Sequence, residues 1–424
     1  MKSPFIWDNY SDQPALLQDK SYKKMMKKRE LASLLTTILV ALFILPFSLI
    51  MTPFIKRRYI ISKDFFSLGV DFEPEQMQEL IKELGVSSLL LRLKLWEMDK
   101  LPLLAAFIKQ NAEKKIILKI MQDRENIEDL TLLRQNLTLI FETLGDFIDI
   151  FEIGTTINRT KWGFFSVREY SAFYKVAYDL KEEKFPNISL IGSGVIDFEY
   201  HFTAHTLFNL QKYRYNGISS LLYVDRRGAP ENMQLGFALS DKIALLSTMV
   251  WLSPKTEQKL YITETNWPLS GTAPYAPTSE TECVDAQTYA NFMLRYHLLA
   301  FASQQVDSLS WHQLIAPGYG LVDNRSGIQK YPAFETYKFM YKSLQNAQFL
   351  RLDIKRDYYI LQCLVDEQIL QIHWSLKATT LQNEDFFEVY SRDGELLKQK
   401  LLNIGASPIY IYILRAVGEK VNCL

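Results

Sequence analysis

The chain is poor in the features that most directly disclose a function. Its 424 residues include only 3 cysteines, widely spaced at positions 283, 363 and 423, so neither a disulfide framework nor a cysteine metal site is expected. Lys+Arg and Asp+Glu both number 48, and this balance leaves no overall positive field to hold nucleic acid. No glycine-rich phosphate loop follows the first β-rich run, which argues against a doubly wound open sheet. We expect no cofactor and no nucleic-acid partner.

One long apolar run stands out against this soluble background. Residues 31–55 contain no charged side chain. A helix of that length, at ~1.5 Å per residue, exceeds the ~30 Å hydrocarbon core of a bilayer. A buried core helix is an alternative, but such helices are rarely apolar on every face for so long. A cleaved signal peptide is another, but cations at 56–58 stand where small residues would precede cleavage. We expect an uncleaved transmembrane helix at 31–55.

The cations that flank this run predict its orientation. Six lie before it and four after it: Lys20, Lys23, Lys24, Lys27, Lys28, Arg29, and Lys56, Arg57, Arg58, Lys63. Because Lys and Arg near a span tend to stay in the cytoplasm, the small excess favours a cytoplasmic tail at 1–30. The main domain would then be periplasmic or extracellular.

Beyond the span, short β-rich runs alternate with helical patterns, which predicts an α/β fold. The runs are 66–72, 87–95, 114–120, 147–154, 188–194, 218–224, 259–264 and 307–311. Segments such as 74–84 and 285–303 place apolar residues at helical spacing between them. This order and size match a (β/α)₈ TIM barrel over residues 64–346, with a doubly wound open sheet as the alternative.

After residue 347 the pattern changes to strands without helices. The runs 349–355, 358–365, 368–376, 386–391 and 408–414 are separated by turn residues such as Asp393-Gly394. We expect a small C-terminal antiparallel β-domain at 347–424. Because no low-complexity linker precedes it, the interface with the barrel should be rigid.

Candidate site residues lie where barrel strands end, since reactive groups of this fold project from those ends. The seventh run ends in Glu264 with Trp267 just beyond, and the eighth ends in Trp311 and His312. A carboxylate beside aromatic rings suits sugar chemistry, because the carboxylate stabilises an oxocarbenium-like centre while the rings stack on the sugar. A rim glutamate paired with arginine is the structural alternative.

Further polar residues extend this predicted mouth. The sixth run leads into Tyr223, Asp225, Arg226 and Arg227, and arginine forks suit carboxylates or phosphates, so an acidic sugar is a reasonable ligand. The alternative is that these charges form Asp–Arg ion pairs within the loop and only stabilise its conformation. Arg92 in the second run is expected to point into the barrel top and keep a facing carboxylate ionised.

Two histidines after the fifth run, His201 and His205, have a spacing that could hold a metal from one helical turn. Phe202 takes the place where an acidic residue would follow the first of them, and we expect no metal site.

These strand ends resemble the clan A (4/7 superfamily) retaining glycoside hydrolases, in particular xylosidase-like members with a C-terminal β-domain. The resemblance covers about residues 65–420 and rests on ITETNW (262–267), on Trp311, on QILQIHWSL (368–376) and on EIGTTIN (152–158). It implies a TIM barrel, a glycan substrate, Glu264 as nucleophile and Trp311 as a sugar-binding residue. Thr155 and Asn158 would also lie at the substrate.

The fourth run departs from the family pattern Glu-Ile-Gly-Asn-Glu-Pro-Asn. The family's acid/base glutamate is replaced by Thr156, and the asparagine before it by Thr155. A threonine hydroxyl titrates far outside the range that general acid catalysis needs. The pair of carboxylates required by a retaining mechanism is therefore broken. Asp225, Glu199 or Glu152 remain as candidates to replace the missing acid.

Two hypotheses follow. The first is a membrane-anchored glycosidase of altered mechanism that acts on envelope or exported polysaccharide. The second is a pseudo-enzyme that keeps the cleft to bind a glycan during surface polysaccharide assembly. A purely structural membrane protein would explain neither the aromatic residues at the mouth nor the charged loop at 223–232. Nothing in the sequence identifies a protein partner.

Overall fold

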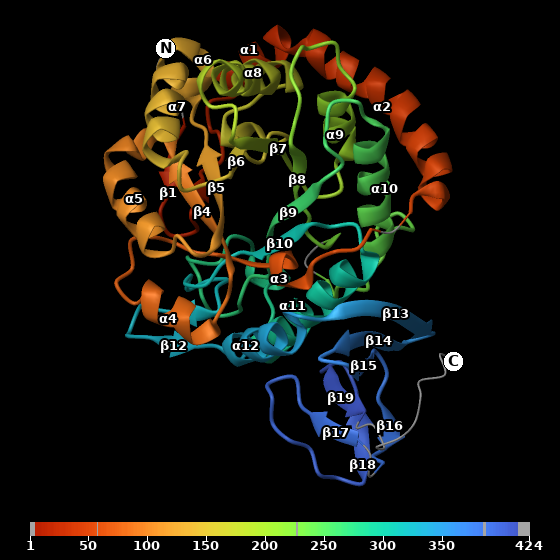
Figure 1. Ribbon diagram of the computed structural model, residues 1–424. Helices are drawn as coiled ribbons and strands as arrows, with labels where there is room; N and C mark the ends of the chain where they lie inside the picture. Colours follow the sequence, from red (N-terminus) through yellow and green to blue (C-terminus); the bar gives the residue numbers. More distant parts are fainter. Residues whose placement is uncertain (1–4, 57, 226–227, 385–386, 414–424) are drawn as a thin grey trace.

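Eight parallel strands form a closed barrel in the order β10-β3-β4-β5-β6-β7-β8-β9 (Figure 1). The computed structural model describes residues 5–56, 58–225, 228–384 and 387–413. The strands are β3 (Phe66–Gly69), β4 (Ser88–Lys94), β5 (Lys115–Met121), β6 (Ile150–Ile153), β7 (Ser189–Ile196), β8 (Gly217–Leu221), β9 (Leu260–Thr265) and β10 (Ser308–Trp311). Each overlaps one of the eight predicted runs. The TIM barrel prediction is confirmed, and the open-sheet alternative is excluded.

Helices surround the barrel between successive strands. They are α4 (Met77–Leu84), α5 (Leu101–Gln110), α6 (Arg124–Glu128), α7 (Leu130–Leu144), α8 (Val167–Lys184), α9 (Tyr200–Leu207), α10 (Leu239–Leu252), α11 (Ala286–Ser303) and α12 (Pro332–Leu344). Side-chain caps define several of their starts. Asp129, Ser166 and Asp285 each accept a hydrogen bond from the first turn of α7, α8 and α11, which satisfies backbone donors that have no partner within the helix.

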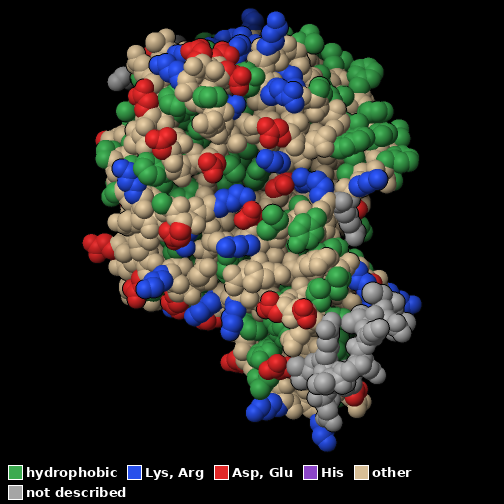
Figure 2. Space-filling model, viewed as in Figure 1, with side chains coloured by type: hydrophobic (Ala, Val, Ile, Leu, Met, Phe, Trp, Pro, Cys, Tyr) green, Lys and Arg blue, Asp and Glu red, His purple; other side chains and the backbone are tan. Residues whose placement is uncertain are grey.

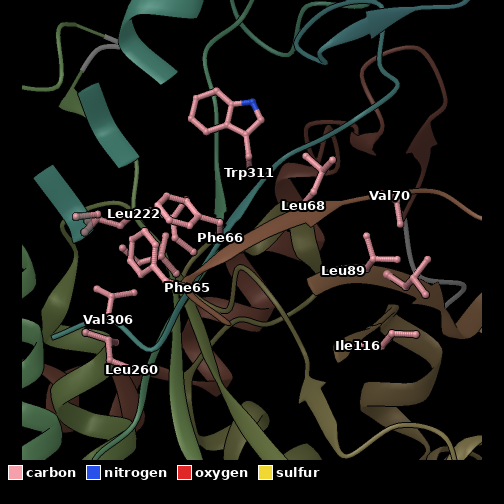
Figure 3. Packing of buried hydrophobic residues seen from close by; sticks show 14 of the residues in the cluster. Phe65, Phe66, Leu68, Val70, Leu89, Ile116, Leu222, Leu260, Val306 and Trp311 are labelled. Atoms are coloured by element: carbon pink, nitrogen blue, oxygen red, sulfur yellow. The ribbon is translucent and has the colours of Figure 1, made fainter. Parts of the chain in front are cut away.

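The core lies between the strands and the helices. Figure 3 shows Phe65 and Phe66 packed together near Leu222, Leu260 and Val306. The two phenyl rings meet edge to face with centroids 4.9 Å apart. Large rings at this position bury much apolar area and tie the start of the barrel to its last strands.

The inside of the barrel has an apolar layer and a charged layer. The apolar layer consists of Leu90, Ile117, Ile150, Ile191 and Tyr261. Two residues further along β4, β5 and β6, the same inward face carries Arg92, Lys119 and Glu152, which are paired in register across the three strands. The side-chain alternation of the strands therefore places charges above the apolar layer, toward the carboxyl ends.

The C-terminal region forms the predicted antiparallel β-domain. Five strands pair in the order β13-β14-β15-β19-β17, and β16 pairs with β18 beside them. Their bounds are β13 (Gln348–Lys355), β14 (Tyr358–Val365), β15 (Gln368–Ser375), β16 (Thr379–Gln382), β17 (Phe387–Tyr390), β18 (Leu401–Ile404) and β19 (Ile409–Ile413). The domain follows α12 directly and lies below the barrel in Figure 1.

A buried ion pair of the barrel is hydrogen bonded to the C-terminal domain. Glu231, from the loop after β8, lies 3.1 Å from Nε of Arg295 on α11. The same carboxylate accepts a hydrogen bond of 3.0 Å from the indole of Trp374 on β15. Glu231 is thus held in place by a side chain of the C-terminal sheet.

The N-terminal helices α1 (Lys20–Arg29) and α2 (Leu31–Met51) lie against the outside of the barrel. Residues Leu31–Phe54 are long and apolar enough to cross a membrane, a property that signal sequences and buried core helices share. Helix α2 packs on α9 and α10. Its inward face is small or polar, namely Ser33, Thr37, Ala41 and Ser48. Its outward face exposes large apolar side chains, among them Leu35, Ile38, Leu42, Phe43, Phe47 and Ile50.

Figure 2 shows hydrophobic side chains gathered along the edge of the molecule where Figure 1 places α2. A patch of this extent is unusual on a soluble surface and marks an interaction site. Specific polar contacts hold the opposite face on the barrel: Thr37 Oγ1 lies 2.8 Å from His205 Nδ1, and Glu30 accepts hydrogen bonds from Ser166 and Arg168.

Candidate active site at the barrel mouth

Glu264, near the end of β9, is the best-defined carboxylate of the mouth. Tyr223 donates a hydrogen bond of 2.7 Å to its Oε1, and Lys119 Nζ lies 3.4 Å from its Oε2. Burial raises the pKa of Glu264, but His312, Lys119 and the Tyr223 hydroxyl outweigh burial and lower this pKa to about 2. Glu264 is therefore ionised across the physiological range.

Lys119 on β5 also pairs with a second carboxylate, that of Glu152 on β6. Its ammonium lies 3.5 Å from Glu152 Oε2, and Thr263 donates a hydrogen bond of 2.9 Å to Glu152 Oε1. Burial raises the pKa of Glu152 above its ordinary value, although Lys119 opposes the shift. The Glu152 side chain is 0% exposed, so a glycan in the mouth cannot reach it. Glu152 could replace the missing acid only if β6 were arranged differently.

The end of β6 is neutral. Thr155 and Thr156 are both buried, and their hydroxyl oxygens are 3.3 Å apart. Gln122 fixes this turn, because its side-chain amide donates to the carbonyl oxygen of Thr155 and accepts from the Thr155 N–H. Thr156 has φ of +51°, a left-handed conformation that β-branched residues rarely adopt. The position that resembles the acid/base residue thus carries no acid and is shielded by packing.

The other two candidate acids have partners of their own. Glu199 accepts hydrogen bonds from Asn158 and Arg159 at 2.7 and 2.5 Å, and Arg159 also pairs with Asp197. Asp225 lies 3.4 Å from the side-chain amide of Gln234. Asn158 is therefore engaged in a loop network with Glu199 and with the carbonyl oxygen of Ile196.

The two predicted aromatic residues of the mouth are buried. Trp267 and Trp311 are each 0% exposed and stack on one another with ring centroids 5.9 Å apart. The Trp267 indole donates to the carbonyl oxygen of Gly228, and that of Trp311 donates to the Tyr289 hydroxyl. In this conformation neither ring has a face open to a sugar. Both rings instead pack on residues of α11, between the barrel and its outer helices, and not at the mouth where the sequence had placed them.

Arg92 and His312 lie close to Glu264 and contribute to its electrostatics. Arg92 donates a hydrogen bond of 3.1 Å to Gln313 and pairs with Asp12. His312 stacks on Tyr319, and burial lowers its pKa to about 4, so its ring is neutral near pH 7. Arg226 and Arg227 lie outside the described residues.

The sequence suggested no metal site, and His205 has a structural partner in Thr37. Within the described ranges, no group of three or more His, Cys, Asp and Glu side chains is placed to hold a metal ion.

A segment near the chain start, which no sequence pattern predicts to be part of the site, lies across the mouth. Residues Trp7–Asp8 (β1) and Gln13–Pro14 (β2) form a short antiparallel hairpin near the chain start. Between these strands, Asp12 pairs with Arg92 and lies 3.5 Å from Lys94. Burial raises the pKa of Asp12, but the charges of Arg92 and Lys94 outweigh it and lower this pKa below its ordinary value. Nothing local in the sequence marks these residues, because Asp12 and Arg92 are far apart along the chain.

Comparison of the fold with solved structures supports the barrel assignment. A family 39 glycoside hydrolase from Bacteroides cellulosilyticus WH2 aligns with a TM-score of 0.63 at 14% identity, covering 84% of this chain and 82% of that chain. A GH39 β-xylosidase from Caulobacter crescentus gives 0.56 at 10% identity, over 85% and 98%. The GH51 arabinofuranosidase from Xanthomonas axonopodis pv. citri gives 0.55 at 13% identity, over 84% and 97%.

No protein-family model and no curated protein matches this sequence. The similarity to the solved structures lies at the level of the fold, a TIM barrel, to which this chain adds a C-terminal antiparallel sheet.

Proposed function

We propose that this protein is a membrane-attached, glycoside hydrolase-like protein that acts on an envelope or exported polysaccharide, with Glu264 as its nucleophile. The observation that carries the proposal is the Glu264 carboxylate, held ionised by Tyr223 and Lys119 at the end of β9 in a barrel of this fold. A nucleophilic carboxylate must be deprotonated and aimed at the mouth, and the low pKa of Glu264 supports the first of these conditions.

In this mechanism a Glu264 oxygen attacks the anomeric carbon while the bond from that carbon to the leaving oxygen breaks. Water then cleaves the glycosyl ester, which returns Glu264 as a carboxylate. Tyr223 holds one carboxylate oxygen through its hydroxyl, and the attacking oxygen is the one that lies 3.4 Å from Lys119 Nζ. Because Thr156 supplies no acid at the end of β6, the leaving oxygen departs without a proton from that position.

The test is a screen of acidic and neutral exopolysaccharides, followed by Glu264→Gln on any substrate that is cleaved. We expect Glu264→Gln to reduce kcat by about a thousandfold or more, since the amide is not a nucleophile. Glu257→Gln is the matched control, because Glu257 precedes the same strand at the far end of the barrel and is exposed. Equal turnover by wild type and Glu264→Gln would refute the assignment.

A second function, glycan binding without catalysis, is favoured by one observation. The buried Thr155–Thr156 turn removes the acid on which the leaving group of an ordinary substrate depends. For such a pseudo-enzyme, Glu264→Gln should leave the Kd for the glycan within about threefold of wild type. Turnover that disappears in Glu264→Gln would reject this alternative.

Membrane attachment is assigned to α2, but with an arrangement that differs from the sequence expectation. A spanning α2 would place residues 1–30 across the membrane from the barrel. The ion pairs of Arg29 with Glu169 and of Arg168 with Glu30 support an α2 that stays on the barrel and inserts only its outward apolar face. The cations at both ends of α2 would then lie at the same headgroup layer.

Epitopes at the N- and C-termini, probed in sealed vesicles, distinguish the two arrangements. Protection of both ends, or exposure of both, is expected for the in-plane helix. Protection of one end alone would restore the spanning helix. Phe43→Glu together with Phe47→Glu on the outward face should release the protein from vesicles, whereas a double substitution on exposed residues of α7, Leu130→Glu with Leu139→Glu, should not.

A further inference from the structure

The N-terminal hairpin contacts the barrel mouth through side chains that a ligand would otherwise meet. Its anchors are polar: the Gln13 amide donates to the carbonyl oxygen of Pro277 at 3.0 Å, and Lys161 donates to Gln13 Oε1 at 2.6 Å. Tyr10 packs edge to face on Tyr275. These contacts come from opposite sides of the mouth, so the hairpin bridges it.

Asp12, at the tip, occupies a pocket built for an anion. The Arg92 guanidinium and the Lys94 ammonium both pair with its carboxylate, and the Tyr319 hydroxyl lies 3.5 Å from Oδ2. The Arg92 side chain is only 10% exposed. A buried guanidinium is costly without a negative partner, so this pocket favours an anion whether or not Asp12 is present.

The hairpin also supplies an aromatic ring. Trp7 lies against Trp96, which follows β4, with ring centroids 5.1 Å apart, and it meets Trp162 edge to face at 5.7 Å. Lys94 Nζ lies 4.6 Å from the Trp7 ring centroid. A groove of about 550 Å³ opens beside Trp7 and Trp96. The hairpin therefore presents an apolar ring to Trp96, with the two ring planes tilted by 51°, and a carboxylate to Arg92.

We propose that Arg92, Lys94 and Tyr319 form a binding site for the carboxylate of a uronic acid residue in the glycan, and that Asp12 occupies this site until the ligand displaces the hairpin. The proposal rests on the glycan-directed function above and adds its substrate class. A uronic acid combines the same two features as the hairpin, an apolar sugar face for Trp96 and a carboxylate for Arg92. A neutral glycan would displace Asp12, which would deprive Arg92 of its ion pair and leave Lys94 with Glu97 alone, at 3.8 Å.

The test uses the full-length protein and calorimetric binding of a galacturonic acid trisaccharide, with its methyl ester as the neutral probe. Asp12→Asn keeps the shape of the hairpin tip and removes its charge. We expect this variant to bind the acid about tenfold or more tightly than wild type does, and to prefer the acid to the ester by a similar factor. Adding Lys94→Gln to Asp12→Asn should bring that preference back toward one.

Gln13→Ala loosens the hairpin without touching the anion pocket, and guards against an Asp12 variant that fails to fold. It should raise affinity for the acid as well, whereas Gln18→Ala, on an exposed residue of the same segment, should not. Hydrogen exchange of residues 5–15 should accelerate on adding the acid and stay unchanged with the ester.

The proposal is overturned if neither Asp12→Asn nor Gln13→Ala binds the acid more tightly than wild type, or if the ester binds Asp12→Asn as tightly as the acid. Acetate that displaces the trisaccharide at equal concentration would refute the sugar part. These outcomes are independent of catalysis. Acid-selective binding without turnover supports the carboxylate site and rejects the hydrolase. Turnover of neutral glycans alone supports the hydrolase and rejects the carboxylate site.

Discussion

The carboxyl ends of β6 and β9 both lie at the same end of the barrel, but they differ in charge and in how deeply their side chains are buried. At β9, Glu264 is ionised, hydrogen bonded to Tyr223 and turned to the mouth. At β6, Thr156 is neutral, buried and held behind the Gln122 contacts. The end of β9 therefore carries an ionised carboxylate, while the end of β6 carries two buried hydroxyl groups. Lys119 from β5 and Tyr223 from the loop after β8 stabilise the charge of Glu264.

The largest effect expected from this difference is a dependence on the leaving group. A general acid is worth about 10²–10⁴ in rate, and a leaving group of low pKa does not need one. We therefore expect kcat/KM for a dinitrophenyl glycoside to exceed that for the matching alkyl glycoside by at least the upper end of this range. Similar rates for the two would reveal an acid that replaces Thr156.

Removal of the shared cation should cost the most stability. Lys119→Met leaves Glu152 and Glu264 buried without their common partner, and we expect unfolding to become easier by about 3–5 kcal/mol. Urea denaturation measures the change. The control is Lys115→Met on the same strand, whose half-exposed pair with Asp64 should be worth less than about 1 kcal/mol. Equal losses for the two variants would mean that Lys119 is not the centre of the charged layer.

The two carboxylates should affect stability with opposite dependence on pH. The pKa of Glu264 is lowered from 4.5 to about 2, so it stabilises the fold above its ordinary pKa, and this contribution is lost as pH falls toward 2. That shift corresponds to about 3 kcal/mol. The pKa of Glu152 is raised, so its contribution is present at low pH and is lost as pH rises through the raised value.

The free energy of unfolding, measured against pH in Glu264→Gln and in Glu152→Gln, separates the contributions of the two carboxylates. Glu264→Gln should flatten the loss of stability between about pH 5 and 2, and Glu152→Gln should flatten the decline above pH 4.5. Parallel curves for both variants would contradict the assignment of charged and neutral forms.

A smaller effect is expected at the neutral end of β6. Gln122→Ala leaves the backbone groups of Thr155 and the carbonyl oxygen of Trp162 without their buried partner. We expect a loss of about 2 kcal/mol in urea denaturation, with the kinetics on the dinitrophenyl glycoside unchanged. Gln110→Ala on the exposed end of α5 is the control and should change stability by less than about 0.5 kcal/mol. A kinetic defect in Gln122→Ala would show that β6 still takes part in the reaction.

The barrel and the β-domain could be predicted because apolar periodicity determines strands and helices one segment at a time. Glu264 was found by its place at a strand end. Lys119 was missed because it sits inside the apolar run 114–120 and nothing local shows that its side chain points inward to two acids. The burial of Trp311 depends on Tyr289 from α11, and Asp12 reaches Arg92 only through the fold. Contacts between distant segments leave no periodic signal.

The contact of Trp374 and Arg295 with Glu231 has a consequence for how such chains are recombined. Glu231, in the loop that begins with Tyr223, contacts Arg295 of the barrel and Trp374 of the β-domain. Its position therefore depends on both domains. A chain ending at residue 346 would lose the indole but retain the buried acid. A foreign β-domain grafted onto this barrel would have to supply a hydrogen-bond donor for Glu231. Glu231, Arg295 and Trp374 would therefore have to be transferred as a set.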